Sequence, residues 1–198
     1  MSSTVERIIL AGFGGQGIHS LGRILAETGM NVGKSVSCIT FGNDDLSNCD
    51  SNCSVILADN EIASPMVTVP DAVIAMNKDA LSKYSYKIKA GGMLMYDSSV
   101  IERQQFRDDI RLYEIPANAI AKEIGDVSLA GFVMAGAYAR FSKQFTLEDV
   151  INALPQMLKE FDESAITLDK AAITRGYNYV AEKKYMFGRY VHSIFKGI

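Results

Sequence analysis

The chain has 198 residues, of which 48% are hydrophobic and 22% are charged. This length predicts one domain over residues 1–198, with enough apolar side chains for a substantial core. The net charge of −3 gives no basic footprint for nucleic acid, and no apolar run is long enough to cross a bilayer. The first residues lack the basic start of a signal peptide, so we expect a cytoplasmic protein.

The most informative segment is residues 7–18, an apolar run that ends in four glycines within six positions. Such a run is typical of a buried strand that turns sharply into a helix, because glycine accepts the positive φ that the turn requires. The helix is expected over residues 18–30, where apolar residues recur at the spacing of one packed face. These residues are Ile18, Leu21, Ile24 and Leu25.

The glycine loop itself matches G-x-G-x-x-G and predicts a binding site for an anionic group, most often a phosphate. A merely tight turn is the alternative. The predicted binding residues are Gly12, Phe13, Gly14, Gly15, Gln16 and Gly17.

Two common nucleotide-binding loops do not fit the sequence. A dinucleotide site needs an acidic residue at the end of the second strand, but the expected region holds Val36, Ser37 and Cys38, and Asp44 comes only after Gly42. NAD binding in the usual manner is therefore disfavoured. The P-loop is excluded because Ile18 and His19 follow the last glycine, where Lys and Ser or Thr are needed.

The remaining elements alternate between strands and helices as far as Pro116 and are helical thereafter. This order predicts an α/β fold with a mainly parallel sheet, covered on both faces, and a helical C-terminal part. The helix over 130–141 is rich in small residues, which favours tight packing on the sheet. We expect strands at Ser35–Phe41, 53–57, 71–76, Met93–Asp97 and Arg111–Ile115, a loop at 42–52, and helices at 78–90 (capped by Asn77), Ala117–Ile124, 130–141, 147–158 and 163–184.

Residues that carry chemistry are few. The three cysteines are expected to be free thiols; a metal or iron–sulfur site at Cys49-x3-Cys53 is the alternative, although no histidine completes a ligand set. His19 and His192 have no nucleophile at a recognisable spacing, and no paired carboxylates form an acid–base set. We therefore predict no catalytic residue, which indicates a subunit whose partners perform the chemistry. The aromatic segment 185–195 either folds back on the domain or covers a partner.

Taken together, the motifs resemble the gamma subunit of the 2-oxoacid:ferredoxin oxidoreductases, which act on pyruvate, 2-oxoglutarate or 2-ketoisovalerate. The beta subunit of indolepyruvate oxidoreductase is similar. The resemblance runs roughly from Arg7 to Tyr179, and its most specific part is the loop Gly-x-Gly-Gly-Gln-Gly. Further matches are residues 24–27, 52–56, 70–77, 91–92, 134–137 and 172–177.

The resemblance implies a Rossmann-like three-layer domain in a hetero-oligomeric complex of anaerobic metabolism. Such a complex converts a 2-oxoacid and coenzyme A into an acyl-CoA and carbon dioxide and passes two electrons to ferredoxin. It implies thiamine diphosphate on the alpha and beta subunits and iron–sulfur clusters on the beta and delta subunits. In some members the domain helps to bind coenzyme A, and the glycine loop suits a phosphate of that coenzyme.

One segment departs from the family. The family carries Tyr-Gly-Pro-Glu-x-Arg-Gly-Gly after its second strand, whereas residues 41–50 keep only the aromatic residue and the first glycine. Asp44, Asp45 and Asp50 bring negative charge where the family has an arginine fork, and carboxylates repel an anion. A partner that supplies the missing cation, an unusual family member and a merely solvated loop are the alternatives.

Three hypotheses follow. The chain is a non-catalytic gamma subunit of a 2-oxoacid oxidoreductase, a stand-alone nucleotide-binding oxidoreductase, or a structural subunit without a ligand. The first follows from the resemblance, and the acidic loop motivates the third.

Overall fold

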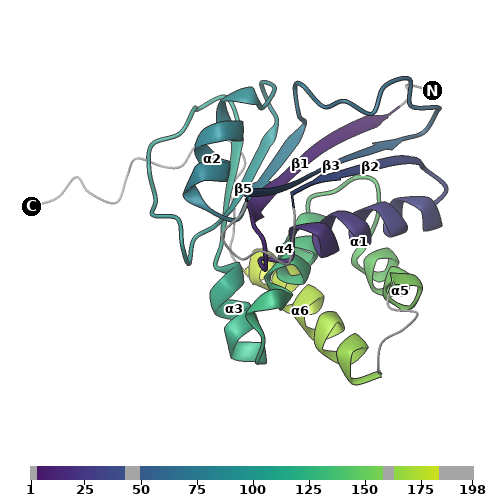
Figure 1. Ribbon diagram of the computed structural model, residues 1–198, viewed down its shortest axis with the longest axis vertical. Helices are drawn as coiled ribbons and strands as arrows, with labels where there is room; N and C mark the ends of the chain where they lie inside the picture. The colour runs from purple at the N-terminus through teal and green to yellow at the C-terminus, as the bar shows by residue number, and fades with distance from the viewer. Residues whose placement is uncertain (1–3, 43–49, 158–162, 183–198) are drawn as a thin grey trace, which may run out of the picture.

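A computed structural model describes residues 4–42, 50–157 and 163–182. Within these residues, six strands form one mixed sheet (Figure 1). The spatial order of the strands is β2-β3-β1-β4-β5-β6. Their bounds are β1 Val5–Phe13, β2 Ser35–Phe41, β3 Asp50–Ala58, β4 Ala72–Ala75, β5 Met93–Asp97 and β6 Arg111–Ile115.

The sheet is mostly parallel, as predicted. Strand β1 pairs in parallel with β4, β4 with β5, and β5 with β6. Strand β3 is the exception, because it runs antiparallel to both of its neighbours, β1 and β2. Since β3 separates β1 from β2, the second strand of the chain lies at one edge of the sheet and not beside the first.

The strands alternate between two cores of unequal size. In β1, Ile8 and Leu10 face the larger core, while Ile9 and Ala11 face the smaller one. The central strands β4 and β5 are buried at every position, which explains why their sequences read as continuous apolar runs. Edge strand β2 is at most half-buried along its whole length.

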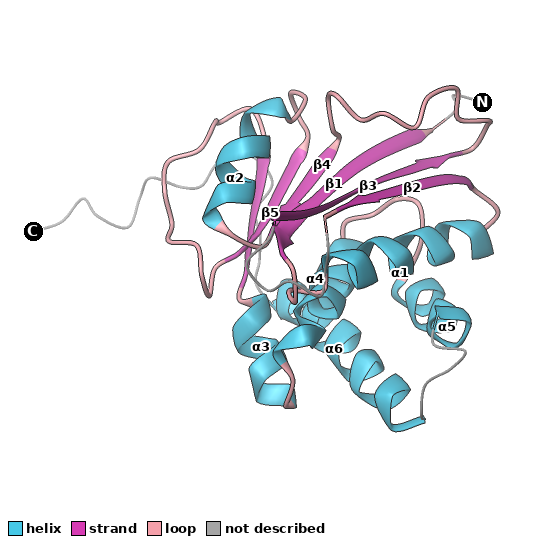
Figure 2. Ribbon diagram, viewed as in Figure 1, coloured by secondary structure: helices cyan, strands magenta, loops and turns pink. Residues whose placement is uncertain are grey.

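The helices cover the two faces unevenly (Figures 1 and 2). Helices α1, α3, α4, α5 and α6 lie on one face of the sheet, and α2 lies on the other. The expected three layers are therefore present, with one thick helical layer and one thin one. The helices are α1 Ile18–Asn31, α2 Lys78–Tyr84, α3 Ala117–Ile124, α4 Ala130–Ala139, α5 Leu147–Met157 and α6 Glu163–Glu182, with short 3-10 turns η1 Ser85–Lys87 and η2 Val127–Leu129.

Local sequence accounts for where several helices begin. Asn77 caps α2 by accepting a hydrogen bond from the Ala80 N–H (2.7 Å). Thr146 and Asp149 cap α5 reciprocally, since the Thr146 N–H donates to Asp149 Oδ2 (2.7 Å) and the Asp149 N–H donates to Thr146 Oγ1 (3.3 Å). On α1, the four apolar residues Ile18, Leu21, Ile24 and Leu25 have no exposed surface. Each of them contributes about 1.5–3 kcal/mol by burial.

The largest differences from the sequence prediction are two element boundaries and one packing partner. Residues 50–52 belong to β3 and not to the preceding loop, because they pair with the end of β1. Helix α2 ends at Tyr84 and not near Ala90, since the chain continues as the 3-10 turn η1. Helix α4 makes its closest backbone contacts with α6 and not with the sheet: a Cβ at Gly136 would meet the carbonyl of Ile173, and one at Gly176 that of Val133.

Among the residues that the structure describes, no helix is both long enough and apolar enough to cross a membrane.

Candidate functional site

The predicted binding loop lies at the carboxyl end of β1, between that strand and α1. Gly15 and Gly17 have φ values of 81° and 73°, which a residue with a side chain adopts only under strain. Gly17 is the N-cap of α1, and no side chain caps the helix there. The first turn of α1 holds no acidic residue, so no carboxylate of this turn repels an anion at the helix end.

Gln16 holds the loop in shape with both ends of its side-chain amide. Its Oε1 accepts a hydrogen bond from the Phe13 N–H (2.7 Å), and its Nε2 donates to the carbonyl oxygen of Met76 (3.0 Å). The sequence predicted Gln16 as one of the residues of the anion-binding loop. In the structure the amide instead ties the loop to the end of β4, so Gln16 is a positioning residue.

The glycines of the loop differ in what surrounds them. A Cβ at Gly12 would meet Gln16 Oε1 and the Met76 side chain, so this position needs glycine for packing. A Cβ at Gly17 would lie 2.8 Å from the carbonyl oxygen of Ser128, where the loop packs against the start of α4. Gly15, in contrast, is exposed, and nothing lies within 4 Å of the place where its Cβ would be. It is the glycine that is open to a ligand.

The N-terminal end of strand β3 lies beside the loop. Ser51, which is almost fully buried, pairs with Gly12 across the β1–β3 ladder. Its Oγ lies 3.2 Å from Nε2 of His19 in the first turn of α1. His19 therefore contacts the sheet, a contact that the sequence did not reveal because Ser51 was placed in a loop.

A small cleft opens on the other face of the sheet, between the end of β1 and α2. About 20 Å³ of it is open to water, which is room for a single water molecule and not for a nucleotide. Lys83 Nζ lies 3.9 Å from Asp50 Oδ2 at this cleft, and both side chains are largely exposed. The lining residues are Ala11, Gly12, Asp50, Ser51, Asn52, Asp79, Ala80, Lys83 and Tyr84.

Lys83 places a positive charge beside the segment in which the family carries an arginine and this chain does not. The sequence indicated that the segment after β2 lost its positive charge, and Asp50 of that segment lies opposite Phe13 in the ladder. The structure brings Lys83 of α2 close to this carboxylate. Sequence reasoning missed Lys83 because it is 33 positions from Asp50 along the chain. Asp44 and Asp45 lie outside the described residues.

Two further polar side chains lie at the carboxyl edge of the parallel strands. Asn77, after β4, is 6% exposed, and its Nδ2 has no hydrogen-bond partner among the described residues. Asp97, at the end of β5, is fully buried, which raises the pKa of its carboxyl group. Its oxygens accept hydrogen bonds from the N–H groups of Ser99 (2.8 Å) and Asn118 (3.0 Å), so it anchors the start of α3.

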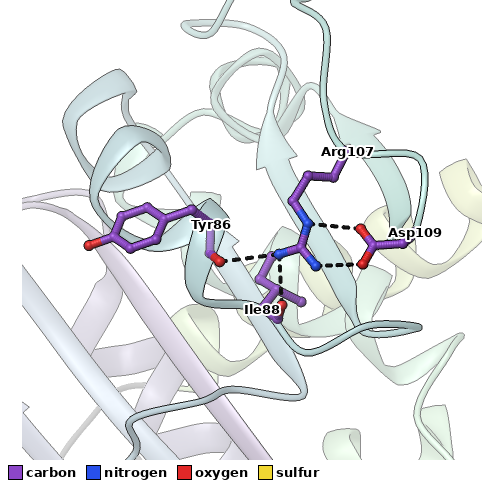
Figure 3. A network of polar contacts seen from close by, with 4 residues as sticks. All are labelled: Tyr86, Ile88, Arg107 and Asp109. Atoms are coloured by element: carbon purple, nitrogen blue, oxygen red, sulfur yellow. Dashed lines mark hydrogen bonds and ion pairs between the residues drawn. The ribbon is translucent and has the colours of Figure 1, made fainter.

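Arg107 is the centre of a separate polar network (Figure 3). Its guanidinium donates to both carboxylate oxygens of Asp109 (2.8 and 2.6 Å) and to the carbonyl oxygens of Tyr86 (3.1 Å) and Ile88 (2.9 Å). These bonds use four of the five N–H groups of the guanidinium. Arg107 therefore fastens the turn after α2 to the segment before β6.

The strand order bears on the dinucleotide hypothesis. In a dinucleotide fold, the acidic residue that binds the ribose follows the strand beside the glycine loop. Here β3 occupies that place and runs in the opposite direction, so its N-terminal end meets the loop. The end of β2, where the usual ribose contact would lie, is one strand further from the loop.

Other sequence candidates fall outside the described residues, namely Cys49, His192 and the segment 185–195. Over residues 4–42, 50–157 and 163–182, no group of three or more His, Cys, Asp or Glu side chains is placed to hold a metal ion.

The sequence profile of the pyruvate ferredoxin/flavodoxin oxidoreductase family matches residues 7–179. The chain belongs to this family. The match covers the glycine loop and all six described strands except the first two residues of β1. The resemblance inferred from the loop and its flanking segments is confirmed.

Two relatives within the family differ in how much of their length this chain covers. Subunit KorC of the 2-oxoglutarate synthase of Methanocaldococcus jannaschii is 29% identical over 181 residues, which is 89% of this chain and 95% of KorC. Subunit VorA of the ketoisovalerate oxidoreductase of Methanothermobacter marburgensis is 31% identical over 130 residues, 66% of this chain. The aligned part is only 27% of VorA, so this chain spans about a quarter of that relative.

Two solved structures share the fold. The gamma subunit of a keto/oxoacid ferredoxin oxidoreductase from Geobacter sulfurreducens superposes with a TM-score of 0.77 at 24% identity, over 90% of this chain and 98% of that subunit. The 2-oxoglutarate:ferredoxin oxidoreductase of Magnetococcus marinus, solved with 2-oxoglutarate, coenzyme A and succinyl-CoA, superposes with a TM-score of 0.79 at 19% identity. It matches over 94% of this chain and 32% of its own chain. The α/β fold class is confirmed.

Proposed function

We propose that this chain is the gamma subunit of a 2-oxoacid:ferredoxin oxidoreductase. The complex would oxidatively decarboxylate a 2-oxoacid with coenzyme A, yielding an acyl-CoA and carbon dioxide and reducing ferredoxin. The family match supports this proposal, as do the names of the relatives, one a 2-oxoglutarate synthase subunit and one a ketoisovalerate oxidoreductase subunit. The substrate class is a 2-oxoacid.

In this proposal the chain is one cytoplasmic domain that is inactive alone. Thiamine diphosphate would lie on alpha and beta subunits and iron–sulfur clusters on beta and delta subunits, and ferredoxin would meet the complex and not this chain.

The contribution of the domain would be to bind a phosphate group of coenzyme A at the glycine loop. One observation carries this step: Gly15 is exposed, with open space at its Cβ position, beside the uncapped N-terminus of a 14-residue helix. Backbone N–H groups and the helix dipole favour an anion at such a point. Two further donors lie on the α2 side of the loop. Lys83 lines the same cleft as Gly12, and Nδ2 of Asn77, just after β4, has no hydrogen-bond partner among the described residues.

The loop's role can be tested with a pair of alanine variants in the assembled complex. Gly15→Ala adds a methyl group in the loop, while Gly33→Ala adds one just after α1, at a φ of 79° and likewise with nothing within 4 Å. Both variants carry the same backbone strain, so a difference between their KM values for coenzyme A reports a contact between the loop and this ligand. We expect the KM for coenzyme A to rise roughly tenfold or more in Gly15→Ala only, as for the loss of a hydrogen bond to a charged group.

The measurement is anoxic turnover with 2-oxoglutarate and with 2-ketoisovalerate, with reduction of ferredoxin as the signal. Equal KM values for coenzyme A in the two variants would overturn the phosphate site and favour a structural subunit without a ligand. The subunit assignment is tested separately by anoxic affinity purification of the tagged chain. Co-purification of chains that bear thiamine diphosphate and iron–sulfur clusters is expected, and their absence would overturn it.

A further inference from the structure

Two cysteines meet on the antiparallel strands β2 and β3. Cys38 lies on β2 and Cys53 on β3, and their Sγ atoms are 3.5 Å apart. Cys38 pairs with Val55 and Cys53 with Thr40, so the two cysteines are diagonal neighbours on the same face of the sheet. Cys38 is exposed and Cys53 is fully buried.

The surroundings of the two thiols suit a disulfide better than a metal ion. A structural zinc site needs four ligands, and the described residues contain no cluster of even three metal-ligating side chains. A disulfide needs an S–S distance of about 2.05 Å, so the sulfurs must approach by about 1.5 Å. Among the described strands, β2 is an edge strand and pairs with β3 alone, so it can make this small shift without breaking a second ladder.

We propose that Cys38 and Cys53 form a redox-sensitive pair that hydrogen peroxide closes to an intrachain disulfide. In the first step Sγ of Cys38 attacks the peroxide; an S–O bond forms, the O–O bond breaks, and hydroxide leaves. In the second step Sγ of Cys53 attacks Sγ of Cys38; the S–S bond forms, the S–O bond breaks, and hydroxide leaves and takes the proton of the Cys53 thiol. Both sulfurs are oxidised, and the peroxide is reduced to two molecules of water.

The order of the two steps follows from the environment of each thiol. The hydrogen bond with Cys53 lowers the pKa of the Cys38 thiol. Since the thiolate is the reactive form, an exposed cysteine with a lowered pKa reacts first. The buried Cys53 is shielded from peroxide but lies beside the oxidised sulfur, so it is placed to resolve it.

The Cys53 side chain packs directly against helix α1. A Cβ at Gly22 of α1 would meet Sγ of Cys53, so the helix lies directly on this sulfur. Two residues before Cys53, Ser51 contacts His19 in the first turn of α1. Drawing the Cys53 sulfur toward β2 therefore acts on the contact between β3 and the helix that begins at the glycine loop. The disulfide itself does not depend on the proposed function.

The test uses the 198-residue chain, reduced and then treated with hydrogen peroxide under anoxic conditions. Remaining thiols are alkylated, and intact mass and peptide mapping follow. We expect a Cys38–Cys53 disulfide with the loss of two hydrogens, reversed by dithiothreitol, and a rise in Tm of roughly 5–10 °C. Cys38→Ser should abolish both changes, whereas Cys49→Ser should leave both intact.

A further variant identifies which sulfur reacts first. In Cys53→Ser, Cys38 should accumulate as a sulfenic acid that dimedone traps. The proposal would be overturned if peroxide left both Cys38 and Cys53 open to alkylation, if Cys49 took the place of either in the disulfide, or if Cys38→Ser still showed the rise in Tm.

Discussion

The side-chain amide of Gln16 donates a hydrogen bond to the carbonyl oxygen of Met76, which ties the loop after β1 to the end of β4, 60 residues later in the chain. The same amide accepts from the Phe13 N–H within the loop. The glycines make the turn sterically accessible, but Gln16 selects one shape of it. This division explains why a glutamine stands among the glycines.

Gln16→Glu should weaken the loop while preserving its size. The carboxylate still accepts from the Phe13 N–H, but it faces the Met76 carbonyl without a proton to donate. We expect a loss of about 1–3 kcal/mol in the free energy of unfolding, measured by urea denaturation at pH 7. Gln105→Glu makes the same charge change at an exposed position, so it should differ little from the wild type. Equal stability of the two variants would contradict a loop-forming role for Gln16.

Gly136→Ala should destabilise the protein, although alanine in place of glycine ordinarily stabilises a helix by about 1 kcal/mol. The added methyl group would meet the backbone of Ile173, where α4 and α6 are in contact, and a helix backbone cannot give way without moving α6. We expect a loss of about 1–3 kcal/mol or more in urea denaturation.

Gly29→Ala in α1 is the matched control for this change. Its methyl group would meet the end of the Leu57 side chain, which can move, so a smaller loss is expected. A Gly136→Ala variant as stable as Gly29→Ala would show that α4 and α6 are not packed through their backbones.

Asp169 should make the protein less stable as the pH rises. Burial, and after it the charge of Asp126, raises the pKa of Asp169 from 3.8 to about 6. The folded state therefore holds the proton more tightly than the unfolded chain does. This contribution is complete below pH about 4 and is lost as the pH rises to about 6, with a total of up to about 3 kcal/mol.

Asp169→Asn mimics the protonated form, so it should remove this part of the pH dependence and raise Tm at pH 8 relative to the wild type. Thermal unfolding between pH 4 and 8 is the measurement. Asp108→Asn, at an exposed position, should follow the wild-type profile. An Asp169→Asn profile that declines as steeply as the wild type would refute the assignment.

Arg107→Lys should loosen one turn without unfolding the protein. A lysine cannot bond both oxygens of Asp109 and two carbonyl groups at once, because it lacks the planar fork of arginine. We expect faster hydrogen exchange at Gly91, whose N–H donates to the carbonyl oxygen of Asp109 (2.7 Å), and little change in Tm. Arg23→Lys on the exposed side of α1 should leave this exchange rate unchanged.

The candidate site was predictable from the sequence only in part. The loop from Gly12 to Gly17 is local, so its strand–turn–helix geometry follows from its own residues. The separate roles of its glycines do not, because Gly12 packs on Met76 and Gly17 on Ser128, and both partners are distant in the chain. The contact between His19 and Ser51 could not be predicted from the sequence for the same reason.

The sequence by itself determined the elements and the family, since apolar periodicity and glycine spacing record which residues are buried and where the chain turns. Four elements have the bounds that the sequence predicted: Ser35–Phe41, Met93–Asp97, Arg111–Ile115 and Ala117–Ile124. The tertiary structure decided the direction of β3, the pairing of α4 with α6, and the proximity of Lys83 to Asp50 and of Cys38 to Cys53. A period of two or of 3.6 residues shows which face of an element is buried, but not which distant segment covers that face or in which direction it runs.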